Sequence, residues 1–264
     1  MQQNTKRKPK GFFLLGRIQN YCIMEVQKML YEMNYNPTME ISVSKGNTKL
    51  GKGIYTFNLM PGEKPISTKD KGELTNVVGT CGGCCSECEG KCYAINDTRR
   101  YHNTCIPSLA KNTLIMRNDM DGMFHQLKEH INKHKVKVLR YHSSGEIESY
   151  DYLLHMVKLA VEMPDVKFYF YTKRFEFIDE YITNYEKSPE NLICNISEWK
   201  GNTNGFNLAG LNVFMYDDNT DDSMKNICHC PAVDKNGKKT NIHCDQCKRC
   251  FSKNDGHITA VYSH

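Results

Sequence analysis

Cysteine is the residue type that most constrains what this chain can fold into. The sequence contains 13 cysteines in 264 residues, and ten of them fall in two short groups. The first group is Cys81, Cys84, Cys85, Cys88 and Cys92, and the second is Cys228, Cys230, Cys244, Cys247 and Cys250. A secreted disulfide scaffold would be shorter and would carry a signal peptide, whereas the N-terminal apolar stretch here spans only residues 12–15. Clustered thiols in a reducing compartment instead predict metal or redox chemistry.

Composition is otherwise that of a globular protein, with 39% hydrophobic and 25% charged residues. These values exclude a wholly disordered chain, a collagen and a coiled coil. No apolar run approaches the roughly 18 residues of a membrane span, so we expect no membrane partner and a cytoplasmic location.

Net charge gives little indication of a nucleic-acid partner. Lys and Arg number 35 against 30 Asp and Glu, and four of the five excess positive charges lie in the tail at residues 6–10. The rest of the chain therefore nets only +1, which predicts no large basic surface. The tail itself is interpreted either as a solvated segment or as a weak nucleic-acid contact.

The order of predicted elements indicates an α/β fold. Hydrophobic periodicity predicts helices over residues 18–33, 107–117, 121–134, 149–163 and 175–185, and strands over 53–60, 136–142, 166–172, 191–197 and 211–216. Strands alternating with helices favour a parallel sheet or an open barrel. We expect a partial parallel (β/α) barrel over residues 41–223, after a basic tail and helix over 1–40. A small cysteine-rich metal module would follow over 224–264.

Polar side chains follow four of the predicted strands. They are Arg140, His142, Ser144, Gly145 and Glu146; Tyr171, Thr172 and Lys173; Asn195, Ser197 and Glu198; and Asp217 and Asp218. In parallel barrels the functional residues lie at the carboxyl ends of the strands. The sequence therefore predicts one shared pocket. The alternative is that each set is only the polar beginning of a loop. Arg140 and His142 share one face of their strand by its period of two.

The first cysteine group allows two ligand triplets. Cys81, Cys85 and Cys88 give C-x3-C-x2-C, which is similar to the radical S-adenosylmethionine signature. Cys81, Cys88 and Cys92 give C-x6-C-x3-C. Three thiolates on a four-iron cluster leave one iron open for an exchangeable ligand. A structural zinc site with four thiolates is the alternative.

The second cysteine group predicts a closed site with four thiolates. Cys230 precedes a turn, and Cys244, Cys247 and Cys250 then follow at x2 spacing. A zinc ion or a second iron–sulfur cluster there would stabilise a tail too short to build its own core. Auxiliary electron transfer, substrate anchoring and zinc-ribbon-like nucleic-acid binding are the further interpretations.

Ordered motifs resemble the gene product 88 family of phages and mobile elements, which is similar to three-cysteine, radical-SAM-like proteins. They are SKGN at residues 44–47, IYTFNL at 54–59, CYA at 92–94, LRYHSSGE at 139–146, PDVKFY at 164–169, YTK at 171–173, CPA at 230–232, and the C-x2-C-x2-CF end at 244–251. The resemblance covers roughly residues 41–251. It favours the C-x6-C-x3-C-Y-A triplet and implies a host bacterial cytosol.

The resemblance to radical enzymes implies roles for the polar strand ends. A [4Fe-4S] cluster would bind S-adenosylmethionine, with Ser144, Gly145 and Glu146 at the methionyl ammonium. Thr172, Asn195 and Ser197 are the further expected cofactor-binding residues. Lys173 would meet the methionyl carboxylate or remain a solvated cation. His142 would be a general acid–base or a satisfied pocket histidine, and Arg140 would bind an anionic group or pair with a neighbour such as Glu198.

Two functions follow from these patterns. The first is an iron–sulfur, radical-SAM-like enzyme that cleaves S-adenosylmethionine to act on an unidentified substrate. In this case Arg140, His142 and Lys173 would be the catalytic residues. The second is a non-catalytic binding protein stabilised by zinc or iron–sulfur centres, and associated with nucleic acid in phage or plasmid replication.

Overall fold

The computed structural model of the chain describes residues 35–66, 75–83, 86–185, 187–199, 202–216 and 227–262. The helix expected over residues 18–33, the cysteines Cys84 and Cys85, and the expected strand-end carboxylates Asp217 and Asp218 lie outside these residues. None of the helices in the described ranges is both long enough and apolar enough to cross a membrane.

Eight strands form one sheet in the order β1-β2-β3-β4-β5-β6-β8-β7. They are β1 (Val43–Lys45), β2 (Ile54–Phe57), β3 (Val138–Tyr141), β4 (Lys167–Thr172), β5 (Leu192–Glu198), β6 (Asn212–Tyr216), β7 (Ile227–His229) and β8 (Ile258–Val261). Only β1 runs antiparallel to its neighbour, and all other pairings are parallel. The predicted mixed α/β fold is confirmed. Within the described ranges the sheet is open, with β1 and β7 at its edges.

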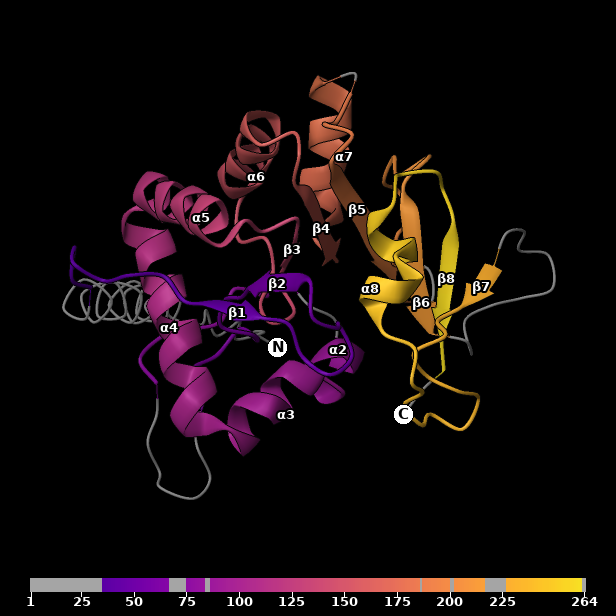
Figure 1. Cartoon of the computed structure of the whole chain (residues 1–264), viewed down its shortest axis with the longest axis horizontal. Coiled ribbons are helices and arrows are strands. Elements are labelled where there is room, and N and C mark those ends of the chain that lie inside the picture. The colour runs from indigo at the N-terminus through magenta and orange to yellow at the C-terminus, as the bar shows by residue number, and fades with distance from the viewer. Residues whose placement is uncertain are drawn as a thin grey trace, which may run out of the picture.

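The two faces of the sheet are covered differently (Figure 1). Four helices pack on one face: α4 (His102–Asn118), α5 (Met120–His134), α6 (Tyr150–Glu162) and α7 (Phe175–Asn184). The other face is associated with the short helices α2 (Ser86–Gly90), α3 (Tyr93–Arg100) and α8 (Cys244–Cys247), and with the 3₁₀ turn η2 (Arg249–Phe251).

Strand alternation divides the apolar side chains between these two faces. On β4, Phe168 and Phe170 enter the main core beneath the helices, while Tyr169 packs on the opposite face beside Phe251. The alternation follows from the period of two in a strand. The helix predicted over residues 121–134 is present as α5, and its apolar stripe of Met123, Phe124, Leu127 and Ile131 is buried in the main core.

Helix boundaries follow local capping chemistry with one departure. The Ser149 hydroxyl accepts a hydrogen bond from the Tyr152 backbone at 3.1 Å and begins α6, as predicted. Helix α4 begins at His102 rather than at Pro107. Because proline has no backbone N–H to donate, it is favoured in the first turn of a helix. In α4, however, one helical turn lies before Pro107.

The C-terminal segment completes the sheet. β8 lies between β6 and β7, and the Cys230 N–H donates to the Ala260 carbonyl at 2.7 Å. At α8, the N–H groups of Cys244 and Asp245 donate to the carbonyls of Lys49 and Leu50 at 3.0 and 3.1 Å. The segment expected as a module from residue 224 is therefore attached to the main sheet. Its metal content stays a prediction.

Asn112 on α4 ties the antiparallel edge strand to the helix layer, and its loss should destabilise the fold. Its buried amide accepts from the Ser42 N–H at 2.7 Å and donates to the carbonyls of Ser42 and Asn58 at 2.8 and 2.9 Å. We expect Asn112→Ala to lower the free energy of unfolding by about 3 kcal/mol, because buried polar groups lose their partners. Urea denaturation measures this. Asn118→Ala, at the exposed end of the same helix, should cost under about 0.5 kcal/mol, and equal losses would contradict the assignment.

Candidate functional site

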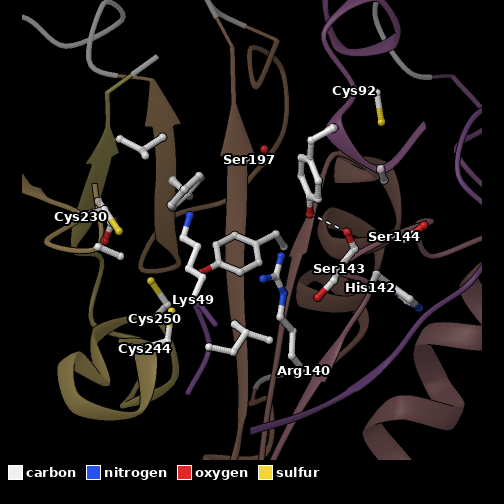
Figure 2. Close-up of a pocket in the computed structure, with 18 of the residues that line it drawn as sticks. Lys49, Cys92, Arg140, His142, Ser143, Ser144, Ser197, Cys230, Cys244 and Cys250 are labelled. Carbon is white, nitrogen blue, oxygen red and sulfur yellow. Dashed lines mark hydrogen bonds between the residues drawn. The ribbon is translucent and has the colours of Figure 1, made fainter. Parts of the chain in front are cut away.

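A cleft of about 1630 Å³ opens on the face of the sheet opposite α4–α7, and both cysteine groups line it. Fourteen of the predicted site residues line this cleft: Cys81, Cys88, Cys92, Arg140, His142, Ser144, Gly145, Glu146, Lys173, Ser197, Cys230, Cys244, Cys247 and Cys250. Thr172 and Asn195 do not line it, and Cys85 lies outside the described residues. Figure 2 shows Arg140 between the second cysteine group and Cys92. The expected shared pocket thus gathers most of the strand-end residues.

The first cysteine group begins beside the carboxyl end of β2. The Thr80 and Cys81 N–H groups donate to the carbonyls of Met60 and Gly62 at 2.8 and 3.1 Å. Gly79 packs so closely there that a Cβ atom would lie 2.1 Å from the Gly62 oxygen. Only glycine fits such a backbone approach. The long connection after β2 therefore returns to the strand that it left.

Arg117 on α4 holds this returning segment. Its guanidinium donates to the carbonyls of Val78 and Gly79 at 3.0 and 3.3 Å and forms a forked ion pair with Glu148. Bidentate pairing of this kind fixes geometry as well as charge. The side chain thus links the segment before Cys81 to the segment between β3 and α6.

Tyr93 fastens the other end of the first cysteine group. Cys92 is the residue before α3, and the adjacent Tyr93 hydroxyl donates to the Ser143 carbonyl at 2.5 Å (Figure 2). The CYA motif is thereby connected to the end of β3. The group from Cys81 to Cys92 is held at both ends against neighbouring parallel strands.

Arg140 places a cation in the floor of the cleft. Its guanidinium lies 4.8 Å from the centre of the Tyr171 ring, and its Nε is buried with no hydrogen-bond partner among the described residues. Burial opposes the charged form, but the hydroxyls of Tyr93, Tyr169 and Tyr171 raise the pKa of Arg140. The expected pairing with Glu198 is not seen in the hydrogen bonds and ion pairs of this region. A buried donor of this kind is suited to an anionic ligand.

His142 is buried and neutral. Its Nε2 lies 3.0 Å from the Tyr152 hydroxyl, and its Nδ1 is buried without a partner in the part of the chain that the structure describes. Burial, with a contribution from Arg140, lowers the pKa of His142 to about 3. The backbone is left-handed here, with φ of 58°, which is uncommon for residues other than glycine. An orphaned nitrogen on a neutral ring can accept a proton or a hydrogen bond.

The Ser-Gly-Glu segment packs tightly against the end of β2. At Gly145, where φ is 82°, a Cβ atom would lie 2.7 Å from that of Leu59, so glycine is required. The Ser144 hydroxyl donates to the Leu59 carbonyl at 3.0 Å. The Glu146 carboxylate accepts from the N–H of Ile147, the Thr172 hydroxyl and the N–H of Lys173 at 2.8–2.9 Å. Burial raises the pKa of Glu146. This carboxylate joins the ends of β3 and β4.

The remaining predicted residues divide between the cleft and the scaffold. Lys173 reaches the cleft and its Nζ donates to the Ser197 hydroxyl at 3.0 Å. Thr172 is buried beneath it. Asn195 donates to the carbonyls of Phe170 and Cys250 at 3.1 and 3.0 Å, which fastens η2 to the sheet. The structure therefore gives Asn195 and Thr172 structural hydrogen bonds.

Four of the five cysteines of the second group line the opposite side of the same cleft. Cys230, Cys244 and Cys250 are labelled in Figure 2. Burial, together with the neighbouring Cys250, raises the pKa of Cys244 to about 11, and burial also raises that of Cys250. A bound metal ion would reverse this, because coordination deprotonates a thiol. Within the described ranges, no three His, Cys, Asp or Glu side chains are grouped closely enough to hold a metal ion.

Apart from Tyr171, which was expected at a strand end, the aromatic residues of the cleft were not among the sequence-predicted pocket residues. Trp199 packs edge-on against Tyr216 at 4.9 Å, and Tyr171 packs against Phe214 at 5.0 Å. These side chains come from β4, β6 and the end of β5, where the even spacing of aromatic residues indicates one strand face. Periodicity alone does not say whether such a face meets a core or a cleft.

Comparison with known proteins gives one match. The model of a family described as gene product 88 matches residues 41–253. No curated protein and no solved structure matches the chain.

The buried His142 should make stability depend on pH. Because its pKa is lowered to about 3 in the folded protein against about 6.5 when unfolded, the unfolded chain binds more protons between these values. We expect acidification from pH 6.5 to 4.5 to cost about 1–2 kcal/mol less in His142→Asn than in the unsubstituted protein. Asparagine tolerates the left-handed backbone. Urea unfolding at several pH values measures this difference.

His125, which is 71% exposed on α5, offers a matched control. The His125→Asn variant should retain the acid sensitivity of the unsubstituted protein. If His142→Asn shows that same sensitivity, the neutral buried histidine is excluded as its source.

Proposed function

Because the chain belongs to the gene product 88 family, whose model covers most of it, we propose that it is an iron–sulfur enzyme with radical-SAM-like chemistry. In this proposal the cleft is the active site. The parallel sheet corresponds to a partial (β/α) barrel, and the first cysteine group holds a [4Fe-4S] cluster. Such a cluster would supply an electron to the sulfonium of bound S-adenosylmethionine.

The observation that carries the proposal is the return of Cys81 to the carboxyl end of β2. Cys81, Cys88 and Cys92 line one cleft together with polar residues from the ends of the neighbouring parallel strands. Catalytic groups of parallel α/β enzymes gather at this end of the sheet. A purely structural metal site would not need to face the strand ends.

The residue types of the first group are those that ligate iron–sulfur clusters, although the described thiols are not grouped closely enough in this structure to hold a metal ion. Cys81, Cys88 and Cys92 are soft thiol ligands on one segment of the chain, with Cys88 in α2 and Cys92 directly before α3, and each is half-buried at the cleft. Three protein ligands would leave one coordination position for a small molecule. The alternative triplet, with Cys85 in place of Cys92, stays a prediction, because Cys85 lies outside the described residues.

The residues of this chain would then have distinct roles. Arg140 would bind an anionic group through its unpartnered Nε, and the neutral His142 would offer its unpartnered Nδ1 for a hydrogen bond to the ligand. Lys173 would meet a carboxylate from its position beside Ser197. We assign Glu146 to positioning, since three protein donors already occupy its carboxylate.

The second proposal is that the chain is a non-catalytic binding protein stabilised by zinc or iron–sulfur centres. It is supported by the second cysteine group, because α8 donates backbone hydrogen bonds to Lys49 and Leu50 in the β1–β2 connection, and the Asn195 side chain on β5 donates to the Cys250 carbonyl in η2. A zinc ion with four thiolates there would stabilise this attachment without any chemistry.

Metal analysis of protein purified without oxygen tests the first proposal. We expect about four irons with matching acid-labile sulfide at the first group, and an absorption band bleached by dithionite. Cys92→Ala should remove most of this iron. Cys105→Ala is the matched control, because Cys105 is also half-buried but lies on α4 away from the cleft, and it should keep the iron.

The second group offers a similar pair of variants. Cys230→Ala should release its metal, whereas Cys228→Ala should not, because Cys228 is exposed on β7 and does not line the cleft. Stoichiometric zinc without sulfide, even after anaerobic reconstitution, would overturn the radical mechanism and favour the binding protein. Iron retained in Cys92→Ala but lost in Cys85→Ala would overturn the ligand triplet.

A further inference from the structure

Positive charge is concentrated in the cleft, although the chain as a whole is nearly neutral. Within the described ranges the cleft is lined by nine lysines and arginines and only two carboxylates, a net charge of +7. Residues 11–264 together net only +1, so the residues of this range that are not among the described lining residues net −6. Thiolate-bound metal centres would offset about three of the positive charges. The remaining excess would focus anions into this cleft.

One wall of the cleft alternates cations with exposed aromatic rings. Lys91 and Arg100 flank the ends of α3, and both are exposed. Tyr93 and Tyr101 lie beside them with 59% and 54% of their surface exposed. Two large exposed aromatic rings on one wall provide flat surface that a stacked ligand could cover. This wall has the composition of a stacking surface beside a phosphate-binding surface.

The opposite wall is also cationic. Lys239 and Lys248 are exposed there, and Arg249 and Lys49 lie deeper. The Arg249 side chain is anchored to the β8 backbone through the Ile258 carbonyl at 3.3 Å. The two walls therefore present cations from opposite sides of one groove, as expected for a channel that follows a charged backbone.

The floor between these walls carries half-buried aromatic side chains. Arg140 lies over the Tyr171 ring at 4.8 Å, and the Lys173 ammonium lies 5.7 Å from the centre of the Trp199 ring. Phe214 and Tyr216 extend the aromatic surface along β6. Flat rings and guanidinium groups stack on nucleobases regardless of base identity.

The size of the cleft indicates a large ligand. Its volume of about 1630 Å³ exceeds the roughly 300–1,000 Å³ typical of small-molecule sites. From its charge, its aromatic lining and its volume, we infer that the cleft binds single-stranded nucleic acid, with phosphates on the two cationic walls and unpaired bases on the aromatic floor. Bases within a duplex are already stacked and could not reach that floor. The inference names the substrate class of the proposed active site and rests on that site, but not on its metal content.

Trp199 provides the readout, because it is the single tryptophan of the chain and it lines the cleft. The full-length protein would be titrated with 12-residue oligothymidylate and oligouridylate. Each should quench the tryptophan emission on binding, and the difference between them tells whether DNA or RNA is preferred. An abasic oligonucleotide of the same length should bind at least about tenfold more weakly, because stacking is lost. A duplex of the same length should also bind more weakly.

Charge variants separate the cleft from non-specific attraction. We expect the double variant Arg100→Gln/Lys239→Gln, with one change on each wall, to weaken oligothymidylate binding about tenfold. The slope of log K against log salt should fall by about 1.4, for two lost phosphate contacts. The matched control is Lys133→Gln/Lys158→Gln, which removes the same charge from exposed positions on α5 and α6. It should leave affinity and slope unchanged, and the basic tail is identical in both proteins.

Several results would overturn the inference. Equal binding of the abasic and base-bearing strands would show a non-specific polyanion site, and unchanged affinity in the cleft double variant would place binding elsewhere. Binding without quenching of the Trp199 emission would show that the bases do not stack on the aromatic floor. These outcomes are independent of the enzyme proposal, since iron and sulfide are measured without nucleic acid. If the protein contains only zinc and still binds the single strand, the nucleic-acid inference stands and the radical mechanism is excluded.

Discussion

The cleft depends on the backbone contacts that return residues 79–81 to the end of β2. About twenty residues separate Met60 from Thr80, and Thr80 nevertheless bonds to the Met60 carbonyl through both its N–H and its hydroxyl. The same hydroxyl accepts the N–H of Glu146, so one buried threonine connects the ends of β2 and β3. Since Glu146 then reaches β4 through Thr172 and Lys173, three strand ends are fixed by one chain of hydrogen bonds. The position of the first cysteine group follows from this chain.

The fold could be predicted from the sequence where periodicity and capping carry the information. The parallel strands at residues 138–141 and 167–172, and helix α6 with its Ser149 cap, lie within the predicted ranges. The short strand β1 and the helices α2 and α3 were not predicted, because three to eight residues hold too little periodicity. The pairing of β8 between β6 and β7 is a long-range contact that no local pattern specifies.

The candidate site was predictable in part for a similar reason. Strand ends in a parallel sheet converge, so Arg140, His142 and Lys173 could be placed together from their order alone. Whether a polar residue faces the cleft or the scaffold depends on its hydrogen bonds, which is why Asn195 and Glu146 were expected as ligand-binding groups and are engaged within the protein. The near-neutral net charge predicted no large basic surface, whereas the described lining of the cleft is cationic. A sum over the whole chain does not say where the cations and the carboxylates lie.

The order of strands has a consequence for how the chain is made. β7 lies at the edge of the sheet and pairs with β8, which is synthesised about thirty residues later. Until residues 258–261 leave the ribosome, β6 keeps an open edge and β7 has no neighbour in the sheet (Figure 1). The second cysteine group lies entirely within that interval or directly beside it. Its thiols are therefore exposed before the sheet can shelter them, and a metal ion captured early by Cys230, Cys244, Cys247 and Cys250 would tie the end of β7 to α8 and η2 while β8 is still to arrive.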